Sequence, residues 1–295
     1  MWNHYKNKIY PYLLVLPILL VFTLVIVIPM LEGLRISFTD WDGIYSVPNY
    51  VGFDNYIRFF KNPDFYNVLL VTVKMGVIII FLQNAFSIFL AIMLQKNSLL
   101  NSSLRSLFFI PGLLTTIVIG LIFSYIFSSS FGIINLLADK VGLDSIAAID
   151  WLGDTRYAFI SVVITSIWQS CGISMMIYMG ALKNIPLEYY ESAYLDGVTA
   201  VKKFRHITFP LLAPAVTVNM LMSVINCIKI FDIPFVMTKG GPAGATKTIA
   251  ILLYEDAFYG RNAGYAAAES FALLLIIFII SILQSQYFRA REVNL

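Results

Sequence analysis

The chain repeats stretches of apolar residues that are each long enough to cross a lipid bilayer as a helix. A hydrocarbon core of roughly 30 Å needs about 20 helical residues at about 1.5 Å per residue. Backbone polar groups inside that core must be satisfied within the segment itself, so each stretch predicts a helix. The stretches cover residues 11–31, 65–94, 106–127, 158–182, 207–237 and 264–288.

Composition supports a membrane protein. Hydrophobic residues make up 59% of the chain and charged residues 13%, which excludes an ordinary soluble domain. The expected fold class is an all-α membrane protein with six transmembrane helices in a single domain over residues 1–295, and no nucleic acid is expected as a partner. Cys171 and Cys227 lie within apolar stretches, so we interpret them as packing residues rather than as a disulfide or metal site.

The distribution of basic residues predicts the orientation of the chain. If the N-terminus is cytoplasmic, Lys and Arg outnumber Asp and Glu in the segments on that side, and the reverse holds in the outer loops. The positive-inside rule then favours a cytoplasmic N-terminus and a cytoplasmic C-terminus, that is, N-in and C-in. The segment 186–206, between the fourth and fifth stretches, is therefore expected in the cytoplasm.

Residues 186–206 are unusually charged for this chain. Each charged side chain would cost about 2.5–3.5 kcal/mol near the centre of a bilayer, so the segment is expected to stay in water. Pro186 suits a first helical turn, Gly197 suits the end of a helix, and Thr199 suits the N-cap of another. The sequence thus predicts a short helix, a glycine turn and a second helix that runs into the fifth stretch.

An apolar face follows the first of these helices. Leu187, Tyr190, Tyr194 and Val198 recur at steps of three and four residues. One interpretation is an amphipathic connector that rests on lipid headgroups. The polar face mixes acidic and basic residues, however, whereas a helix at a lipid surface is usually rich in Lys and Arg. Docking into a groove of another protein fits this mixture better.

The same segment carries a family resemblance. Glu191-Ser192-Ala193, Gly197 and Ile207-Thr208-Phe209-Pro210 resemble the EAA loop of permease subunits of binding-protein-dependent ABC importers. The family prefers Ala at the position of Ser192 and Leu at that of Phe209, and both departures preserve small size or apolarity.

Further stretches resemble the carbohydrate-uptake branch of that family, in particular its MalF/UgpA-like partner. They are FTDWDG (38–43), VGFDNYIRFF (51–60), FDIPFVMTKGGPAGATKTI (231–249) and GYAAAES (264–270). The resemblance implies the type I ABC importer permease architecture and a multi-pass protein of the bacterial cytoplasmic membrane.

In that family the EAA loop is the coupling helix, which sits in a cleft of a cytoplasmic ATPase subunit. The resemblance implies that Glu191 engages a basic group of the ATPase and that Gly197 permits the turn. The side chains implied to fill the cleft are those of Leu187, Tyr190, Ala193 and Tyr194.

The sequence contains no GxxxxGK[ST] phosphate loop, so the chain is not expected to hydrolyse ATP. It also contains no nucleophile elbow, HExxH motif or paired-carboxylate arrangement, so it is not expected to act as an enzyme. The resemblance places ATP and Mg on a separate ATPase dimer and leaves no cofactor or metal on this chain. It also implies a second, MalG-like permease subunit, an extracytoplasmic solute-binding protein and the lipid bilayer as partners. The glycine-rich segment 238–247 is implied to face the binding protein.

Polar residues form two stripes in the fourth and fifth stretches, where they are costly and therefore informative. Their spacing places each stripe on one helical face. Neutral hydroxyl, amide and thiol groups suit a polyhydroxylated solute, and in MalF-like subunits the same two helices line the path. Any single member could equally stabilise helix packing. The stripes are Ser166, Gln169, Ser170 and Ile173, and Asn219, Ser223, Asn226, Cys227 and Ile230.

Other residues in the stretches have weaker assignments. Lys229 and Asp232 are three residues apart, so we expect an intrahelical ion pair with a structural or gate-stabilising role. Trp168 and Tyr178 could add a stacking surface beside the stripes. Lys74 and Glu269 could each pair across helices, with partners that the sequence does not identify.

The leading hypothesis is a permease subunit of an ATP-driven ABC importer for a sugar or oligosaccharide, which forms half of the translocation path. One alternative is a secondary transporter driven by an ion gradient, and another is an ABC importer of a non-sugar solute such as a glycerol phosphate. A secondary carrier would more typically show repeated halves with broken helices and a central acidic site, neither of which the sequence indicates.

Overall fold

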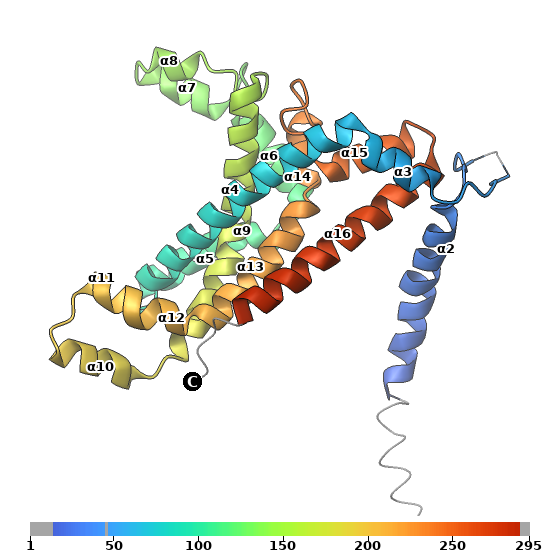
Figure 1. Cartoon of the computed structure of the whole chain (residues 1–295). Helices are drawn as coiled ribbons and strands as arrows, with labels where there is room; N and C mark the ends of the chain where they lie inside the picture. Colours follow the sequence, from blue (N-terminus) through green and yellow to red (C-terminus); the bar gives the residue numbers. More distant parts are fainter. Residues whose placement is uncertain (1–13, 45–46, 290–295) are drawn as a thin grey trace, which may run out of the picture. The chain divides into compact units, whose positions relative to one another are not determined.

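A computed structural model describes residues 14–44 and 47–289 (Figure 1). These residues are mostly helical, and extended pairing among them is limited to one isolated bridge between Thr39 and Tyr50. The chain divides into two compact units, residues 1–62 with 253–275 and residues 63–252 with 276–295. Residues 11–13, at which the first apolar stretch is expected to begin, lie outside the described residues.

The first unit contains the N-terminal apolar helix and a close approach of two backbones. The amide of Gly264 donates to the carbonyl of Trp41 at 2.9 Å, and a Cβ at Gly264 would lie 2.0 Å from the carbonyl oxygen of Thr39. Only glycine fits there. The helical elements of the unit are Leu14–Ile36, whose last part is α2 (Ile28–Ile36), α3 (Asp54–Lys61), the end of α15 (Ile249–Phe258) and the first half of α16 (Ala263–Arg289).

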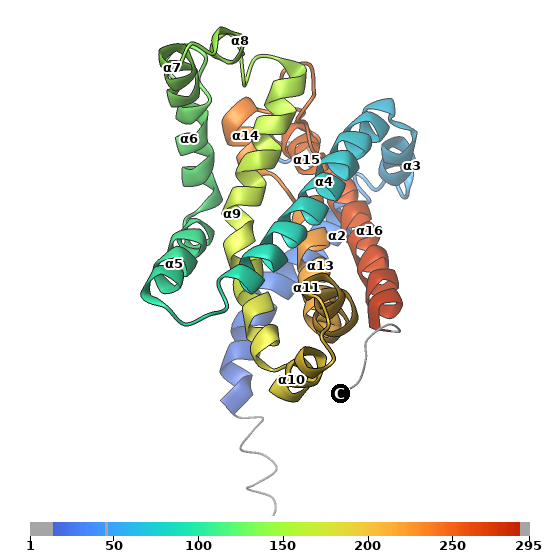
Figure 2. The ribbon, with the colours of Figure 1, turned by 90° about the vertical axis from the view of Figure 1, so that its left-hand side faces the viewer.

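Three helices form the frame of the second unit. α4 (Pro63–Met93) and α9 (Thr155–Lys183) pack along one another, and α13 (Ala213–Ile228) packs against both (Figure 2). One buried apolar cluster surrounds Met175 and Tyr178, and another surrounds Met75 and Val162. The turns of α4 and α9 between these clusters carry the polar side chains of the candidate site.

The third apolar stretch does not form one straight helix. α5 (Leu99–Leu113) and α6 (Thr116–Ile126) meet at an angle of 105°, because Leu114 and Thr115 are extended. Pro111 lies in the last turn of α5, where it removes a backbone donor and favours the end of the helix. The stretch over which the sequence predicts one helix, 106–127, is thus part of two helices joined at this break.

The fifth apolar stretch, expected over 207–237, is also interrupted. Its helical elements are α11 (Ala200–Lys203), a π-helical turn (Phe204–Thr208), α12 (Phe209–Leu211), α13 and α14 (Asp232–Thr238). The chain bends by 69° between Leu211 and Ala213, next to Pro210 and Pro214, and α13 ends at Ile228. Broken helices are thus present, although the sequence did not indicate them.

Two peripheral elements lie at opposite ends of the second unit (Figures 1 and 2). One is the hairpin of α7 (Ile133–Lys140) and α8 (Asp144–Ala147), which Asn135 closes by donating to the carbonyls of Ala147 and Ile149 at 3.0 and 2.9 Å. The other is the helix–turn–helix of α10 (Leu187–Leu195) and α11, which we call the charged elbow.

Four helices of the described chain are long and apolar enough to cross a membrane. The number rises to six if each of the two bent pairs, α5 with α6 and α11–α12 with α13, counts as one span. The four single helices are Leu14–Ile36, Pro63–Met93, Thr155–Lys183 and Ala263–Phe288.

Candidate functional site

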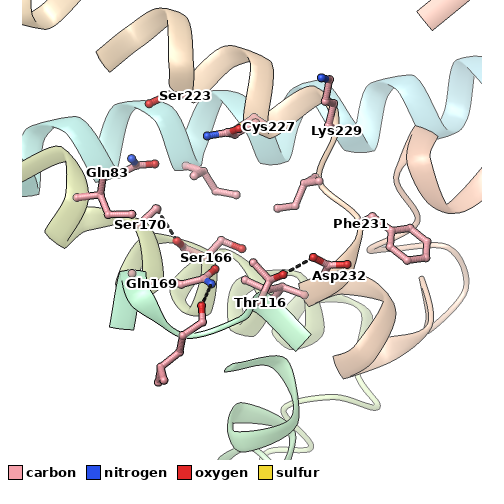
Figure 3. Close-up of a pocket in the computed structure, with 17 residues that line it drawn as sticks. Gln83, Thr116, Ser166, Gln169, Ser170, Ser223, Cys227, Lys229, Phe231 and Asp232 are labelled. Atoms are coloured by element: carbon pink, nitrogen blue, oxygen red, sulfur yellow. Dashed lines mark hydrogen bonds between the residues drawn. The ribbon is translucent and has the colours of Figure 1, made fainter. Parts of the chain in front are cut away.

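A cavity of about 530 Å³ opens in the second unit between α4, α9 and α13. Two helix breaks also border it, one between α5 and α6 and the other between α13 and α14. The size of the cavity falls within the range usual for small-molecule pockets. Figure 3 shows Ser223 and Cys227 of α13 on one side of it and Ser166, Gln169 and Ser170 of α9 on the other. The lining residues are Ile79, Gln83, Gly112, Leu114, Thr116, Ser166, Gln169, Ser170, Ile173, Ser223, Asn226, Cys227, Lys229, Ile230, Phe231, Asp232 and Ile233.

The two polar stripes meet at this cavity. Eight of their nine members line it, and the exception is Asn219. Asn219 is 2% exposed, and its amide donates to the backbone carbonyl of Ser174 at 3.2 Å, so it joins α13 to α9 instead. Helical spacing alone placed Asn219 on the correct face of α13, but it lies one turn beyond the end of the cavity.

The polar side chains in the cavity differ in how many of their donors and acceptors already have a partner within the protein. The hydroxyls of Ser166 and Ser170 donate to the carbonyls of Val162 and Ser166, one turn earlier in α9, at 2.8 and 2.6 Å. Their oxygens keep free acceptor capacity toward the cavity. Asn226 is exposed in the cavity and offers both donors and an acceptor. The lining therefore presents neutral donors and acceptors next to apolar surface.

One backbone carbonyl at each of these two breaks accepts a hydrogen bond from a side chain. Gln169 donates to the carbonyl of Leu114 at 3.5 Å, and Thr248 donates to that of Ile230 at 2.7 Å. Non-helical backbone at membrane depth is tolerated where it lines a cavity and finds such partners. Gln169 thus serves both as part of the cavity wall and as a partner for a break.

Asp232 and Lys229 do not form the expected intrahelical ion pair. α13 ends at Ile228 and α14 begins at Asp232, so the two residues do not share a helical turn. Lys229 points away from Asp232 (Figure 3). The carboxylate of Asp232 instead accepts a hydrogen bond from the hydroxyl of Thr116, the first residue of α6. The prediction was wrong because it assumed one continuous helix.

Several cavity residues lie outside the two predicted stripes, and two residues expected beside the stripes lie elsewhere. Gln83 lines the cavity while its amide donates to the Ser174 hydroxyl at 2.8 Å. Leu114 and Thr116 reach the cavity only because the helix breaks between them, a feature that the proline at 111 could have signalled. Trp168 packs against Phe123, with ring centroids 5.1 Å apart, and Tyr178 is fully buried, so neither lines the cavity.

Lys74 and Glu269, for which the sequence identifies no partner, each have close neighbours in the structure. The Lys74 ammonium lies 5.0 Å from the centroid of the Phe159 ring, a cation–π contact. Glu269, in the first unit, is fully buried and has Asp256 and Tyr265 as polar neighbours. Among the described residues, no three His, Cys, Asp or Glu side chains are placed so that they could hold a metal ion.

The charged elbow is built as the sequence predicts. α10 begins directly after Pro186, and Gly197 adopts a left-handed conformation with φ of 66°. The amide of Val198 donates to the carbonyl of Ala193 at 3.0 Å, and that of Gly197 to Tyr194 at 3.1 Å, which is the Schellman motif. Thr199 is the N-cap residue of α11, although its side chain makes no capping hydrogen bond.

The expected coupling residues fall on two faces of α10. Leu187 and Tyr194 are 72% and 85% exposed, and Glu191 is exposed as well. Ala193 is 4% exposed, and Tyr190 is half-buried with its hydroxyl 3.3 Å from that of Thr208. Leu195 and Val201, which are not part of the predicted apolar face, extend the outward face with exposed fractions of 85% and 76%.

Comparison with known proteins places this architecture in a family. The family model described as "Binding-protein-dependent transport system inner membrane component" matches residues 83–292, which include the charged elbow and all of the cavity lining except Ile79. The chain is 34% identical to the probable ABC transporter permease protein YurN of Bacillus subtilis, over 96% of this chain and 97% of that protein.

Two further similarities agree with this match. The chain is 31% identical to the probable starch degradation products transport system permease protein AmyD of Thermoanaerobacterium thermosulfurigenes, over 99% of this chain and 98% of that protein. Its fold is similar to a chain in the crystal structure of a bacterial alginate ABC transporter in complex with an alginate pentasaccharide-bound periplasmic protein. The TM-score is 0.85 at 19% identity, and the match covers 100% of this chain and 99% of that one. The protein therefore belongs to the inner membrane components of binding-protein-dependent transport systems, as a multi-pass ABC transporter permease.

Proposed function

We propose that this chain is a permease subunit of an ATP-driven ABC importer for a sugar or oligosaccharide and that the cavity between α9 and α13 is part of the solute path. The observation that carries the proposal is the convergence of eight neutral stripe residues on one cavity. Sugars are bound through many hydroxyl groups, so a wall of amides, hydroxyls and apolar patches suits them. Of the proteins named above, AmyD is described as a probable permease of a transport system for starch degradation products, and the chain of similar fold belongs to an alginate transporter.

The proposed arrangement in the membrane has six spans with both termini in the cytoplasm. The two bent pairs each count as one span, which gives six with the four single helices. The charged elbow then lies on the cytoplasmic side, and the α7–α8 hairpin and the 238–247 loop lie on the opposite side in the bacterial cytoplasmic membrane. The positive-inside distribution of Lys and Arg supports this orientation.

The proposed partners are a second, MalG-like permease subunit, an ATPase dimer and an extracytoplasmic solute-binding protein. ATP and Mg bind to the ATPase dimer, and this chain carries no cofactor. Leu187, Glu191 and Tyr194 form the outward docking face toward the ATPase, and Gly197 sets the turn. Ala193 and the half-buried Tyr190 hold that face against the rest of the chain.

The alternatives have less support. An importer of glycerol phosphate would benefit from a cationic cluster in the path, and Lys229 is the one cation among the described lining residues. A carrier driven by an ion gradient would need an acidic ion site. Asp232 is the one carboxylate among the described lining residues, and it is bound to Thr116.

Transport by the reconstituted complex tests the proposal. The permease pair with its ATPase dimer is reconstituted into vesicles, and the solute-binding protein is added outside. Uptake of labelled oligosaccharide is measured with ATP enclosed and with the ion gradients collapsed by ionophores. We expect uptake to require ATP, the binding protein and this chain, and to survive loss of the gradients. Uptake that needs a gradient and no ATP would overturn the proposal.

Two charge reversals on α10 test the coupling face. Glu191→Lys is expected to abolish solute-stimulated ATP hydrolysis while the chain still inserts in the membrane. Glu188→Lys, an exposed acid on the same helix but outside the EAA pattern, is the matched control and is expected to retain activity. Equal activity in both variants would refute the assigned role of Glu191.

A further inference from the structure

Two helices of the second unit begin side by side at the cavity. Thr116 is the first residue of α6 and Asp232 is the first residue of α14, and each follows a break that lines the cavity. The hydroxyl of Thr116 donates a hydrogen bond to the carboxylate of Asp232 (Figure 3). This bond joins residues that are 116 positions apart in the chain and ties one break directly to the other.

α6 and α14 also pack closely beyond this bond. A Cβ at Gly120 would lie 3.0 Å from the Cβ of Val236, so the two helices touch with no space for a larger residue. The breaks themselves are extended or irregular backbone at Leu114–Thr115 and at Lys229–Phe231. α6 and α14 therefore form a packed pair that is connected to α5 and α13 through non-helical residues.

The bond between Thr116 and Asp232 is accessible from the cavity. Both residues line it, and both are only partly buried. Asp232 is the one carboxylate among the described lining residues. A hydroxyl donor that enters the cavity meets a stronger acceptor at Asp232 than at any neutral group of the lining. The hydroxyl of Thr116 and a hydroxyl of the solute are donors of the same kind.

We propose that Asp232 senses the solute by exchange of hydrogen-bond donors. A hydroxyl group of the bound sugar replaces the hydroxyl of Thr116 on the carboxylate of Asp232. Loading of the cavity then removes the bond between α6 and α14. This inference deepens the proposed function and rests on it, because it concerns the response of the permease to the solute that occupies the same cavity.

Donor exchange predicts that substitutions at Thr116 and at Asp232 change the response to solute in opposite directions. A purely structural bond predicts that both change it in the same direction. If Thr116 competes with the solute, removal of its hydroxyl leaves Asp232 free and strengthens the response to solute. Neutralisation of Asp232 removes the charged acceptor and weakens that response. If the bond only holds α6 against α14, removal of either partner damages the same element, so both substitutions act in the same direction.

The experiment measures ATP hydrolysis by the complete reconstituted complex with saturating binding protein, as a function of solute concentration. For Thr116→Val we expect the KM for solute to fall severalfold and hydrolysis without solute to rise. For Asp232→Asn we expect the KM to rise roughly tenfold, as for loss of one hydrogen bond to a charged group. Thr116→Ser restores a hydroxyl at this position and is expected to reverse both changes seen in Thr116→Val.

The outcomes separate this inference from the proposed function. If the wild-type complex shows no solute-dependent hydrolysis, the proposed function fails first. If the wild type responds but the KM moves in the same direction in Thr116→Val and Asp232→Asn, or stays unchanged in Asp232→Asn, donor exchange is overturned. Thr116→Ala carries the same expectation as Thr116→Val and replaces it if the valine variant does not assemble.

Discussion

The hydroxyl of Tyr178 donates a hydrogen bond of 2.6 Å to the side-chain oxygen of Asn84, and both residues are buried between α9 and α4. The amide of Asn84 in turn reaches the Ser223 hydroxyl on α13 at 3.4 Å. The helices behind the cavity are thus joined through one polar network. In the apolar interior of a membrane protein such bonds are commonly worth about 0.6–2 kcal/mol each.

Tyr178→Phe should destabilise the protein without changing solute specificity. The substitution leaves the oxygen of Asn84 buried and unpaired, which costs about 1–3 kcal/mol. The thermal unfolding midpoint of the purified chain in detergent measures this loss, and the KM for solute should stay within twofold of the wild type. A double-mutant cycle with Asn84→Ala should show strong coupling, and additive effects would contradict a direct bond.

Two glycines of α9 should respond in opposite ways to alanine. A Cβ at Gly172 would lie 1.9 Å from the backbone carbonyl oxygen of Phe108 on α5, whereas a Cβ at Gly180 would have no atom within 4 Å beyond its own stretch of helix backbone. Gly172→Ala must push α5 away from α9 and should greatly lower the yield of folded protein. Gly180→Ala should be neutral or stabilising by up to about 1 kcal/mol, because alanine is the better helix former. Similar yields of the two variants would refute the close approach of α5 to α9.

The effect of a substitution at Gly197 should depend on how readily the new residue adopts a positive φ, and not on the size of its side chain. Its φ is 66°, and a Cβ there would have no atom within 4 Å. Gly197→Ala should cost about 1–2 kcal/mol, the penalty for an L residue in the left-handed region, and should weaken ATPase docking in pull-down assays. Gly197→Asn should do less harm, since asparagine enters this region more readily. Equal losses in both variants would point to a side-chain clash with the partner instead.

Two asparagines on α13 should separate transport from stability. Asn226 is exposed in the cavity, whereas Asn219 is buried and bonded to the carbonyl of Ser174. Asn226→Leu should raise the KM for solute roughly tenfold with an unchanged unfolding midpoint, because a hydrogen bond to solute is lost. Asn219→Leu should lower the unfolding midpoint by several degrees and leave the KM of the folded fraction unchanged. The reverse pattern would place the solute path elsewhere.

The loop after α2 should show a depressed carboxyl pKa. The backbone amide of Asn49 donates to Asp40 at 2.8 Å and its side-chain amide at 3.2 Å, and these bonds hold the pKa of Asp40 below its ordinary value of 3.8. A lowered pKa means that this contribution to loop stability is fully present above pH 3.8 and is lost as the pH falls through the lower folded value. Carbon NMR of the labelled carboxyl measures the midpoint. Asn49→Ala should raise the midpoint only in part, because the backbone donor remains, and no change would contradict the role of the side-chain bond.

Periodicity and charge were sufficient for much of the fold. The long apolar runs predicted α4, α9 and α16 within a few residues, and the glycine and proline positions predicted the charged elbow. Both signals are local, since a helix of apolar residues and a left-handed glycine depend on neighbouring residues alone. The two polar stripes were visible for the same reason.

The breaks in α5–α6 and α13–α14 depend on contacts that periodicity does not contain. The apolar stretches extend past Leu114 and past Ile230 and are interrupted only by isolated polar residues, so periodicity alone favours an unbroken helix in each. The breaks are stabilised by distant partners, Gln169 and Thr248, which take over the freed carbonyls. The incorrect prediction of an ion pair between Lys229 and Asp232 follows from the assumption of an unbroken helix. The absence of Thr116 from the predicted cavity residues has the same cause.

The outward apolar face of the charged elbow has a consequence for the biogenesis of the protein. Leu187, Tyr194, Leu195 and Val201 are each more than two-thirds exposed and project into water in the proposed orientation. Until another subunit covers them, these side chains form an exposed hydrophobic patch of the kind that chaperones and quality-control proteases recognise. A cell that makes this chain in excess should therefore degrade the surplus. The rate at which this chain is synthesised then has to match the rate for the subunits that cover it.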